Sequence, residues 1–331
     1  MASLTSLDIA QLIGGLRHPS GLLALQHLTR LESLDCGLDF EPVMHLLLPQ
    51  LPRLRSLRMG ARMPTRCLRP VSALRHLEHL AVHAPADLAE LMAVVAPITS
   101  LRKLWLVKAG RRDGSRVFID EVGSAEVAGL QVARQVTQMA IFSAGLAPGA
   151  MRDLATALPG LESLELQDCV CLASSLCELR RMPRLGTLII GSVFTMDALV
   201  EGALPQPGLR DFPALQTLNI SGIHGAELLP GGDISLLVPR ALASLSLSFD
   251  VPWGQTGSVD ADRFVRAIAA APGLASIHLH RVLDLPLGEE DVEDDGGAED
   301  EMPPAAVAAL SDAVFKKLPC LEKLEVDSYS W

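Results

Sequence analysis

The chain has 331 residues, of which 49% are apolar and only 4% are aromatic. No apolar run approaches the roughly 20 residues that a membrane-spanning helix requires, so we expect no membrane contact. The first residues also lack the basic start and apolar stretch of a secretory signal peptide. These features favour a cytoplasmic location, with the nucleus as the alternative.

The formal net charge is −11, but residues 288–301 contain nine carboxylates and no basic residue, so the remainder carries only −2. The net charge of the whole chain gives no sign of the basic surface that is typical of nucleic-acid-binding proteins, and the acidic run would repel phosphate. We therefore expect no nucleic-acid partner. The composition of about 284–304 favours a disordered, solvated loop. The alternative is a docking segment for a basic partner.

The pattern Leu-x-x-Leu-x-Leu, or a close apolar variant, recurs along the chain, with clear copies at 31–36, 161–166 and 321–326. Most successive copies are separated by 23 to 35 residues, and the last by 47. This period predicts an α/β leucine-rich repeat solenoid of about twelve irregular repeats. The central positions are Leu7, Leu34, Leu57, Leu80, Leu104, Met139, Leu164, Leu188, Leu218, Leu245, Ile277 and Leu324.

Helical patterns precede several of these motifs, at 87–95, 150–158 and 261–269. Between helix and motif stands a proline hinge, and since proline cannot continue a helix, we expect each to end a helix and start a strand. Parallel strands would then line the concave face and helices the convex face of one domain, 1–331. The hinges are Leu51-Pro52, Ala96-Pro97, Leu158-Pro159, Met182-Pro183, Phe212-Pro213, Val238-Pro239, Ala271-Pro272 and Leu318-Pro319.

The longer units carry insertions, the first at about 108–130. Arg111 to Ile119 predicts a small hairpin, followed by a helical stretch around 124–134. Loops on a rigid scaffold often carry recognition, although a solvated excursion is an equal alternative.

The leucines of each motif point inward. Three positions face the concave surface: the residue immediately before the central leucine, the residue immediately after it, and the residue three positions after it. Bulky side chains gather there in the fourth to sixth repeats, and aromatic anchors framed by polar groups are typical of binding hot spots. We expect a protein partner to contact this aromatic patch: His79, His83, Lys103, Trp105, Val107, Gln138 and Phe142. Alternatively, the insertion covers the rings, or the register shifts by one residue because Met139 matches the consensus poorly.

Two groups of residues raise the question of a metal. Cys169, Cys171 and Cys177 lie close together, yet Cys169 stands where the repeat consensus itself has Asn or Cys, and zinc needs a fourth ligand at defined spacing. His278 and His280 alternate on one strand without a third ligand. The six cysteines include no Cys-x-x-Cys pair, which favours reduced thiols. We expect no metal.

No motif for catalysis is present. The glycine pairs lack the order required to hold phosphate, and no nucleophile elbow occurs. We therefore expect neither an enzyme nor a cofactor.

Each unit consists of a helix, the motif Leu-Pro-x-Leu-x-x-Leu-x-Leu and a variable turn. Over nearly the whole chain, this order resembles the repeat portion of F-box proteins and related ribonuclease-inhibitor-like arrays. The resemblance implies a non-catalytic scaffold for a protein partner, such as the substrate-recognition part of a ubiquitin-ligase adaptor. A regulator of an enzyme such as a small GTPase or nuclease is an alternative, with Asp8, Asp35 and Arg58 as candidate rim residues. A sensor domain of an immune-type receptor is another.

The sequence before Leu31 contains no F-box, because residues 4–9 already form a strand pattern. We expect a bare repeat array or a fragment of a longer chain. A solenoid exposes an apolar edge unless it is capped, so an omitted domain or a partner would cover the first repeat.

Overall fold

The computed structural model describes residues 4–9, 19–36, 41–60, 68–83, 88–108, 111–113, 116–118, 121–123, 127, 129–171, 173–191, 194–195, 212–223, 238–249, 259–280, 283–284 and 304–327. The chain divides into two compact units, Met1–Val170 and Cys171–Trp331. The acidic run 288–301 lies outside the described residues, and its predicted disorder stays a prediction. So does the prediction of a single domain.

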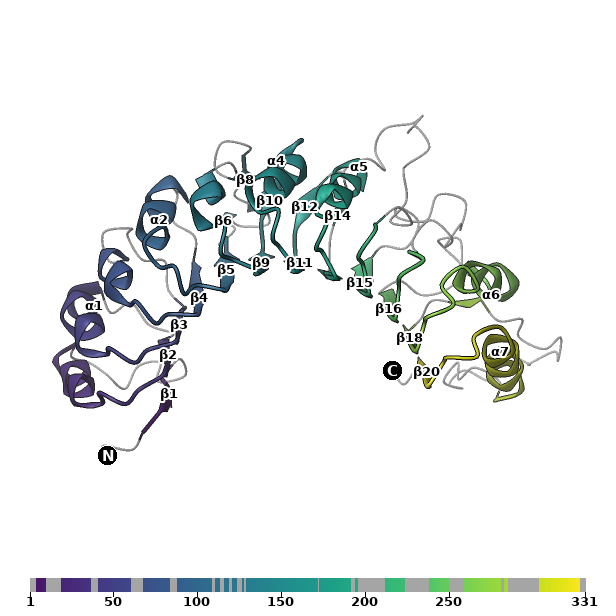
Figure 1. Cartoon of the computed structure of the whole chain (residues 1–331), viewed down its shortest axis with the longest axis horizontal. Helices are drawn as coiled ribbons and strands as arrows, with labels where there is room; N and C mark the ends of the chain where they lie inside the picture. The colour runs from purple at the N-terminus through teal and green to yellow at the C-terminus, as the bar shows by residue number, and fades with distance from the viewer. Residues whose placement is uncertain are drawn as a thin grey trace. The chain divides into compact units, whose positions relative to one another are not determined.

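A ladder of parallel strands forms one side of the first unit (Figure 1). The strands follow one another in chain order: β1 (Ser6–Asp8), β2 (Ser33–Cys36), β3 (Ser56–Met59), β4 (His79–His83), β5 (Lys103–Val107), β9 (Gln138–Phe142) and β11 (Ser163–Gln167). The central motif positions stand in one row: Leu7, Leu34, Leu57, Leu80, Leu104, Met139 and Leu164. The predicted register is confirmed here, including at Met139.

Stacked apolar side chains form the core of this unit. In β3, Leu57 and Met59 are 0% and 2% exposed, whereas Arg58 between them is exposed. This alternation follows from the pleat of a strand, which turns successive side chains to opposite faces. Burying one leucine stabilises the fold by about 1.5–3 kcal/mol. Because each leucine packs on its counterpart in the next repeat, that stabilisation also fixes the register.

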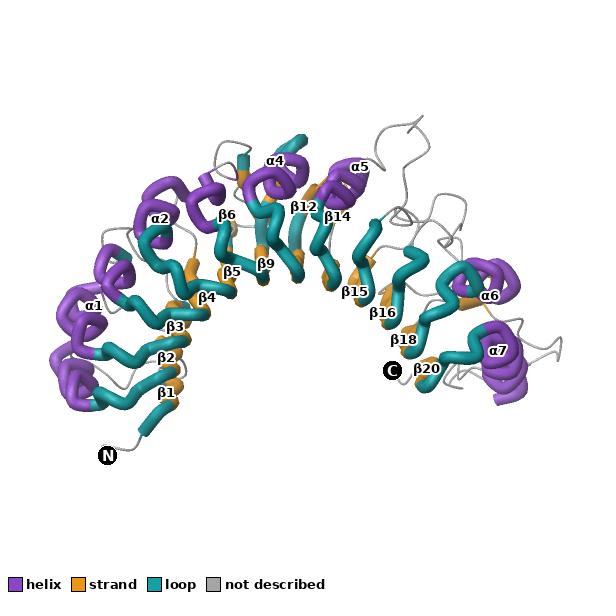
Figure 2. Tube along the Cα trace, viewed as in Figure 1, coloured by secondary structure: helices purple, strands orange, loops and turns teal. Residues whose placement is uncertain are grey.

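Short helices lie on the other side of this unit (Figure 2). They are α1 (Glu41–Leu47), α2 (Leu88–Val95), α4 (Ala150–Ala157) and the 3₁₀ helices Pro19–His27, Leu48–Gln50, Arg69–Ala73 and Gly129–Ala133. The helices predicted at 87–95 and 150–158 are confirmed to within one residue. Many others are 3₁₀ helices, which rise about 2.0 Å per residue against 1.5 Å and so span a short repeat with fewer residues.

Prolines after the helices open turns. The Leu51 carbonyl accepts a hydrogen bond from the Leu54 N–H at 3.2 Å, and the Leu158 carbonyl accepts one from the Leu161 N–H at 3.1 Å. Pro52 and Pro159 occupy the second position of these turns, where the fixed φ of proline is favourable. The helices end as predicted. The strand begins only four residues after each of these prolines, so the prediction that the proline itself starts the strand is wrong.

The insertion contains the predicted hairpin: β6 (Arg111–Asp113) pairs antiparallel with β7 (Arg116–Phe118). Of the helical stretch expected around 124–134, the described residues show mainly the 3₁₀ helix Gly129–Ala133. A second short parallel ladder was not foreseen. Its strands in this unit are β8 (Glu121–Val122), β10 (Gly145–Leu146) and the start of β12 (Val170–Cys171).

The second unit repeats the plan. Its ladder comprises β13 (Thr187–Gly191), β15 (Thr217–Ile223), β16 (Ser244–Phe249), β18 (Ser276–His280) and β20 (Lys323–Asp327), with Leu188, Leu218, Leu245, Ile277 and Leu324 in one row. Further elements are β14 (Phe194–Thr195), β17 (Val259–Asp260), β19 (Leu283–Asp284), α5 (Ala173–Leu176), the 3₁₀ helix Cys177–Arg181, α6 (Ala261–Ile268) and α7 (Pro304–Lys317). The prediction of a leucine-rich repeat solenoid is confirmed.

Across the described ranges, no helix combines the length and the apolar character needed to cross a bilayer.

Candidate protein-binding surface

A ladder of backbone hydrogen bonds positions the three strands that carry the aromatic patch. The carbonyl of Glu78, just before β4, accepts the N–H groups of Arg102 and Lys103 at 2.8 and 2.9 Å. The carbonyl of Arg102, just before β5, accepts those of Thr137 and Gln138 at 2.9 and 3.0 Å. The start of each strand is therefore aligned with the start of its neighbour, and β4, β5 and β9 stay in fixed register.

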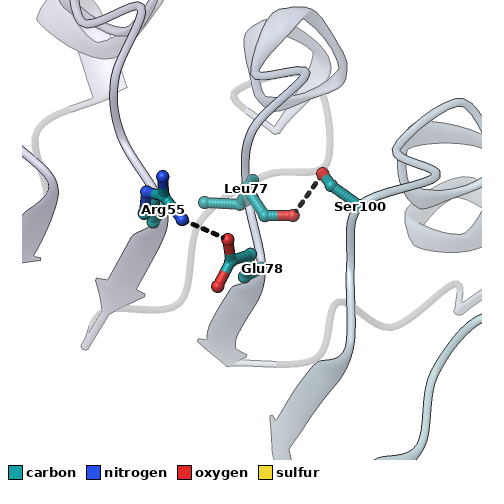
Figure 3. A network of polar contacts seen from close by, with 4 residues as sticks. All are labelled: Arg55, Leu77, Glu78 and Ser100. Carbon is teal, nitrogen blue, oxygen red and sulfur yellow. Dashed lines mark hydrogen bonds and ion pairs between the residues drawn. The ribbon is translucent and has the colours of Figure 1, made fainter.

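Side chains add two further links beside β4 (Figure 3). Arg55 Nη1 lies 2.7 Å from Glu78 Oε1, with side chains that are 58% and 50% exposed. The Ser100 hydroxyl donates to the Leu77 carbonyl at 2.7 Å in a part-buried position. The ion pair is exposed, so it contributes at most about 1 kcal/mol. The serine satisfies a carbonyl with little access to water and so contributes more reliably.

Trp105 lies between two alanines on the open face of the sheet. Register aligns it with Ala81 of β4 and Ala140 of β9. These alanines are only 3% and 1% exposed, whereas Trp105 itself is partly exposed. Small side chains on both neighbouring strands leave room for the indole.

Three rings form a continuous cluster across β4, β5 and β9. The centroids of His79 and Trp105 are 4.7 Å apart with an interplanar angle of 70°, and those of Trp105 and Phe142 are 6.1 Å apart at 61°. Both are edge-to-face arrangements, worth about 0.5–1.5 kcal/mol each beyond the area that they bury. The alternative of a register shift is wrong, because Leu104 stands opposite Met139.

The structure places all seven predicted patch residues on these three adjacent strands. Lys103 stands in one row with His79 and Gln138, and Val107 in another with His83 and Phe142. Lys103 is exposed, and the other six are partly exposed. The rings are thus not completely covered.

Two neighbours that were not among the predicted patch residues also shape the patch. The Ser56 hydroxyl lies 3.3 Å from His79 Nδ1, and Arg58 stands on the same strand as Ser56. The pKa of His79 is lowered, first by burial and then by the positive charges of Lys103 and Arg58. The Lys103 amino group makes no hydrogen bond or ion pair with any residue that the structure describes. Lys103 and Arg58 therefore form a positive region beside the ring of His79.

Carboxylates stand on both sides of this positive region. On β2, Asp35 Oδ2 lies 3.7 Å from Arg58 Nε. The pKa of Asp35 is raised, because burial and the nearby Asp8 together outweigh the effect of Arg58. On β11, Glu165 accepts a hydrogen bond from the Gln167 amide at 3.2 Å.

Cys169 takes a structural position. Its side chain is 0% exposed, and its Sγ lies 3.4 Å from the Ile141 carbonyl and 3.3 Å from that of Gln167, so the thiol donates to the backbone of its own and the neighbouring repeat. Burial raises the pKa of this thiol to about 11. Among the described residues, no three His, Cys, Asp or Glu side chains are grouped to hold a metal.

The other candidate metal ligand whose side chain the structure describes is His278. It lies beside a carboxylate. Its Nδ1 is 3.6 Å from Glu325 Oε2 on the neighbouring strand β20. The side chain of His280 lies outside the described residues.

No protein-family model matches the sequence, and no match to a curated protein was found. Among solved structures, the chain is similar to internalin InlF of Listeria monocytogenes, with 12% identity over 93% of this chain and 83% of that one and a TM-score of 0.39. It is also similar to TLR13 in a complex with ssRNA13 (14% identity, 74% and 30% coverage, TM-score 0.42) and to internalin C2 of Listeria monocytogenes (13%, 54% and 70%, 0.32). Similarities of this size are no evidence of function, and the fold is assigned from the register of the strands.

Proposed function

We propose that the chain is a non-catalytic scaffold that binds a protein partner through the aromatic patch. The observation that supports this most directly is the edge-to-face cluster of His79, Trp105 and Phe142, which remains partly exposed on the open side of a rigid sheet. Exposed aromatic side chains that are clustered and framed by polar groups are typical of interaction sites.

The rings are also organised before any partner arrives. Each packs against the next, and backbone hydrogen bonds hold the three strands in register. Ordering a mobile side chain on binding costs about 0.5–1.5 kcal/mol. Because the rings are already held in place, most of that cost is paid on folding, and contact with them contributes fully to affinity.

Substrate recognition within a ubiquitin-ligase adaptor is the more specific role that we propose, on the resemblance of the repeat units. Regulation of an enzyme through Asp8, Asp35 and Arg58 is a second candidate, since Arg58 and Asp35 lie together at the edge of the patch. A sensor role in an immune-type receptor is a third. The partner's identity separates them: ligase subunits, an enzyme whose activity changes, or a nucleotide-binding receptor module.

Site-specific photo-crosslinking in cells tests the binding face. A photoreactive phenylalanine analogue replaces Ser163, which stands beside Gln138 in the sheet, or Leu46, which is 50% exposed on α1. We expect a specific crosslinked protein from position 163 and none from position 46. Crosslinking of the same protein from position 46 alone would place the interface on the helical side and contradict the proposal.

A further inference from the structure

We infer that the aromatic patch takes an acidic segment of its partner, in which an Asp or Glu stands next to an apolar residue: the carboxylate contacts Lys103 and Gln138, and the apolar side chain packs on Trp105 and Phe142. This inference rests on the proposed function and adds the chemistry of the partner to it. Its physical basis is the charge of the described face of the sheet.

The row of side chains that contains Lys103 has no carboxylate. From β1 to β11 it reads Ser6, Ser33, Ser56, His79, Lys103, Gln138 and Ser163. The acidic residue next in sequence to His79 is Glu78, and its carboxylate is paired with Arg55. The centre of the row offers N–H donors from lysine and glutamine, and Lys103 has no anionic partner among the described residues. An anion placed there meets donors and positive charge.

The apolar part of the site is at a fixed distance from that row. Lys103 and Trp105 are two residues apart on one face of β5, which separates them by about 6.6 Å along the strand. A carboxylate and an apolar side chain on adjacent or next-but-one residues of a peptide reach both positions. A carboxylate alone has no contact with the rings, and an apolar residue alone leaves Lys103 unpaired.

The short distance between carboxylates on the sheet face argues against a nucleic acid. In the row of Trp105, the residues from Arg58 to Ala140 span three strand spacings, or about 14 Å, at about 4.8 Å each. Asp35 and Glu165 stand at its two ends. An extended peptide of about four residues fits that length at about 3.3 Å per residue. A longer phosphate backbone along this row would meet one carboxylate or the other.

Selection of random linear peptides displayed on phage tests the inference on the full chain. Peptides that bind the wild type are counter-selected against the Trp105→Ala/Phe142→Ala variant, and a single-stranded oligothymidylate is titrated in parallel. We expect the remaining peptides to share Asp or Glu beside an apolar residue and the oligonucleotide not to bind. Patch-dependent peptides without a carboxylate would overturn this inference and leave the proposed function standing. Failure to obtain any patch-dependent peptide would contradict both, and tight oligonucleotide binding lost in the variant would assign the patch to nucleic acid instead.

Affinities of a selected peptide then locate the carboxylate. Lys103→Gln should weaken binding about threefold and Lys103→Glu about tenfold at low salt, since an exposed ion pair contributes modestly and reversed charge repels. Changing the peptide's own carboxylate to an amide should also weaken binding, but it should have little further effect in Lys103→Gln, because the two changes remove the same contact. Arg53→Gln, at an exposed turn position off the sheet face, is the matched control and should bind as the wild type does. If Lys103→Gln weakened the binding of the carboxylate peptide and of its amide counterpart by the same factor, the carboxylate would make no contact with Lys103.

Discussion

Trp105 on β5 and His79 on β4 pack edge to face, with 4.7 Å between ring centroids, although 26 positions separate them in the sequence. The leucines behind them bring these residues together, because Leu80 and Leu104 are paired in the same register. The position of the aromatic patch is therefore a direct consequence of how the core stacks.

Alanine substitutions at adjacent positions of β5 should separate surface from core. Leu104 is 0% exposed, so Leu104→Ala should lower the free energy of unfolding by about 2–5 kcal/mol, through lost burial and a residual cavity. Trp105→Ala removes a partly exposed ring with two edge-to-face contacts and should cost about 1–3 kcal/mol, nearer the lower end because the ring stays partly exposed. Urea denaturation measures both. A cost for Trp105→Ala as large as that for Leu104→Ala would show that the indole belongs to the core.

Stability should fall on mild acidification, partly because of His79. The pKa of His79 is lower in the folded chain than the unfolded value of about 6.5, so between these values the unfolded state binds more protons. The stability contributed by the neutral imidazole is therefore complete above about pH 6.5 and falls as the pH drops toward the folded pKa. Urea denaturation of the wild type and of His79→Phe, at several pH values, isolates this effect. We expect a shallower loss in the variant, and identical pH slopes would contradict the assignment.

Cysteine reactivity should follow burial. The pKa of Cys36 is raised to about 12 and that of Cys169 to about 11, so at pH 8 the thiolate is scarce at both, whereas Cys320 is exposed. Iodoacetamide at pH 8 should modify Cys320 rapidly and should modify the other two only after urea is added, as followed by peptide mass spectrometry. Rapid alkylation of Cys169 in the folded chain would show that its contacts with the Ile141 and Gln167 carbonyls do not form.

The two side-chain links beside β4 should differ in strength. Glu78→Gln removes an exposed ion pair and should change the free energy of unfolding by less than about 1 kcal/mol, and by less still at high salt. Ser100→Ala leaves a part-buried carbonyl without its donor and should cost about 1–2 kcal/mol, independently of salt. Thermal denaturation of both variants at low and high salt compares them. A salt-sensitive loss at Ser100 would contradict this distinction.

The sequence pattern predicted the strand register because each leucine packs on its counterpart in the next repeat, so a local motif also specifies the long-range pairing. The patch followed from this register, since the residues between the leucines must face the other way. The 3₁₀ helices and the β8, β10 and β12 ladder did not follow, because both depend on how the connection between strands packs. The effect of Arg58 on the pKa of His79 and the contact of Ser56 with His79 Nδ1 did not follow either, since they depend on side-chain geometry between neighbouring strands.

The role of the aromatic patch is tested most directly by quantitative affinity purification from native cells, with mass spectrometry of the recovered proteins. Wild type is compared with Trp105→Ala/Phe142→Ala and with the control Leu46→Ala/Val132→Ala, which removes two apolar side chains that are each 50% exposed on the helical side. We predict a protein partner that wild type and control recover equally and that the patch variant loses by at least about tenfold, as expected for hot-spot residues. Equal recovery of every partner by all three chains would contradict a binding role for the patch.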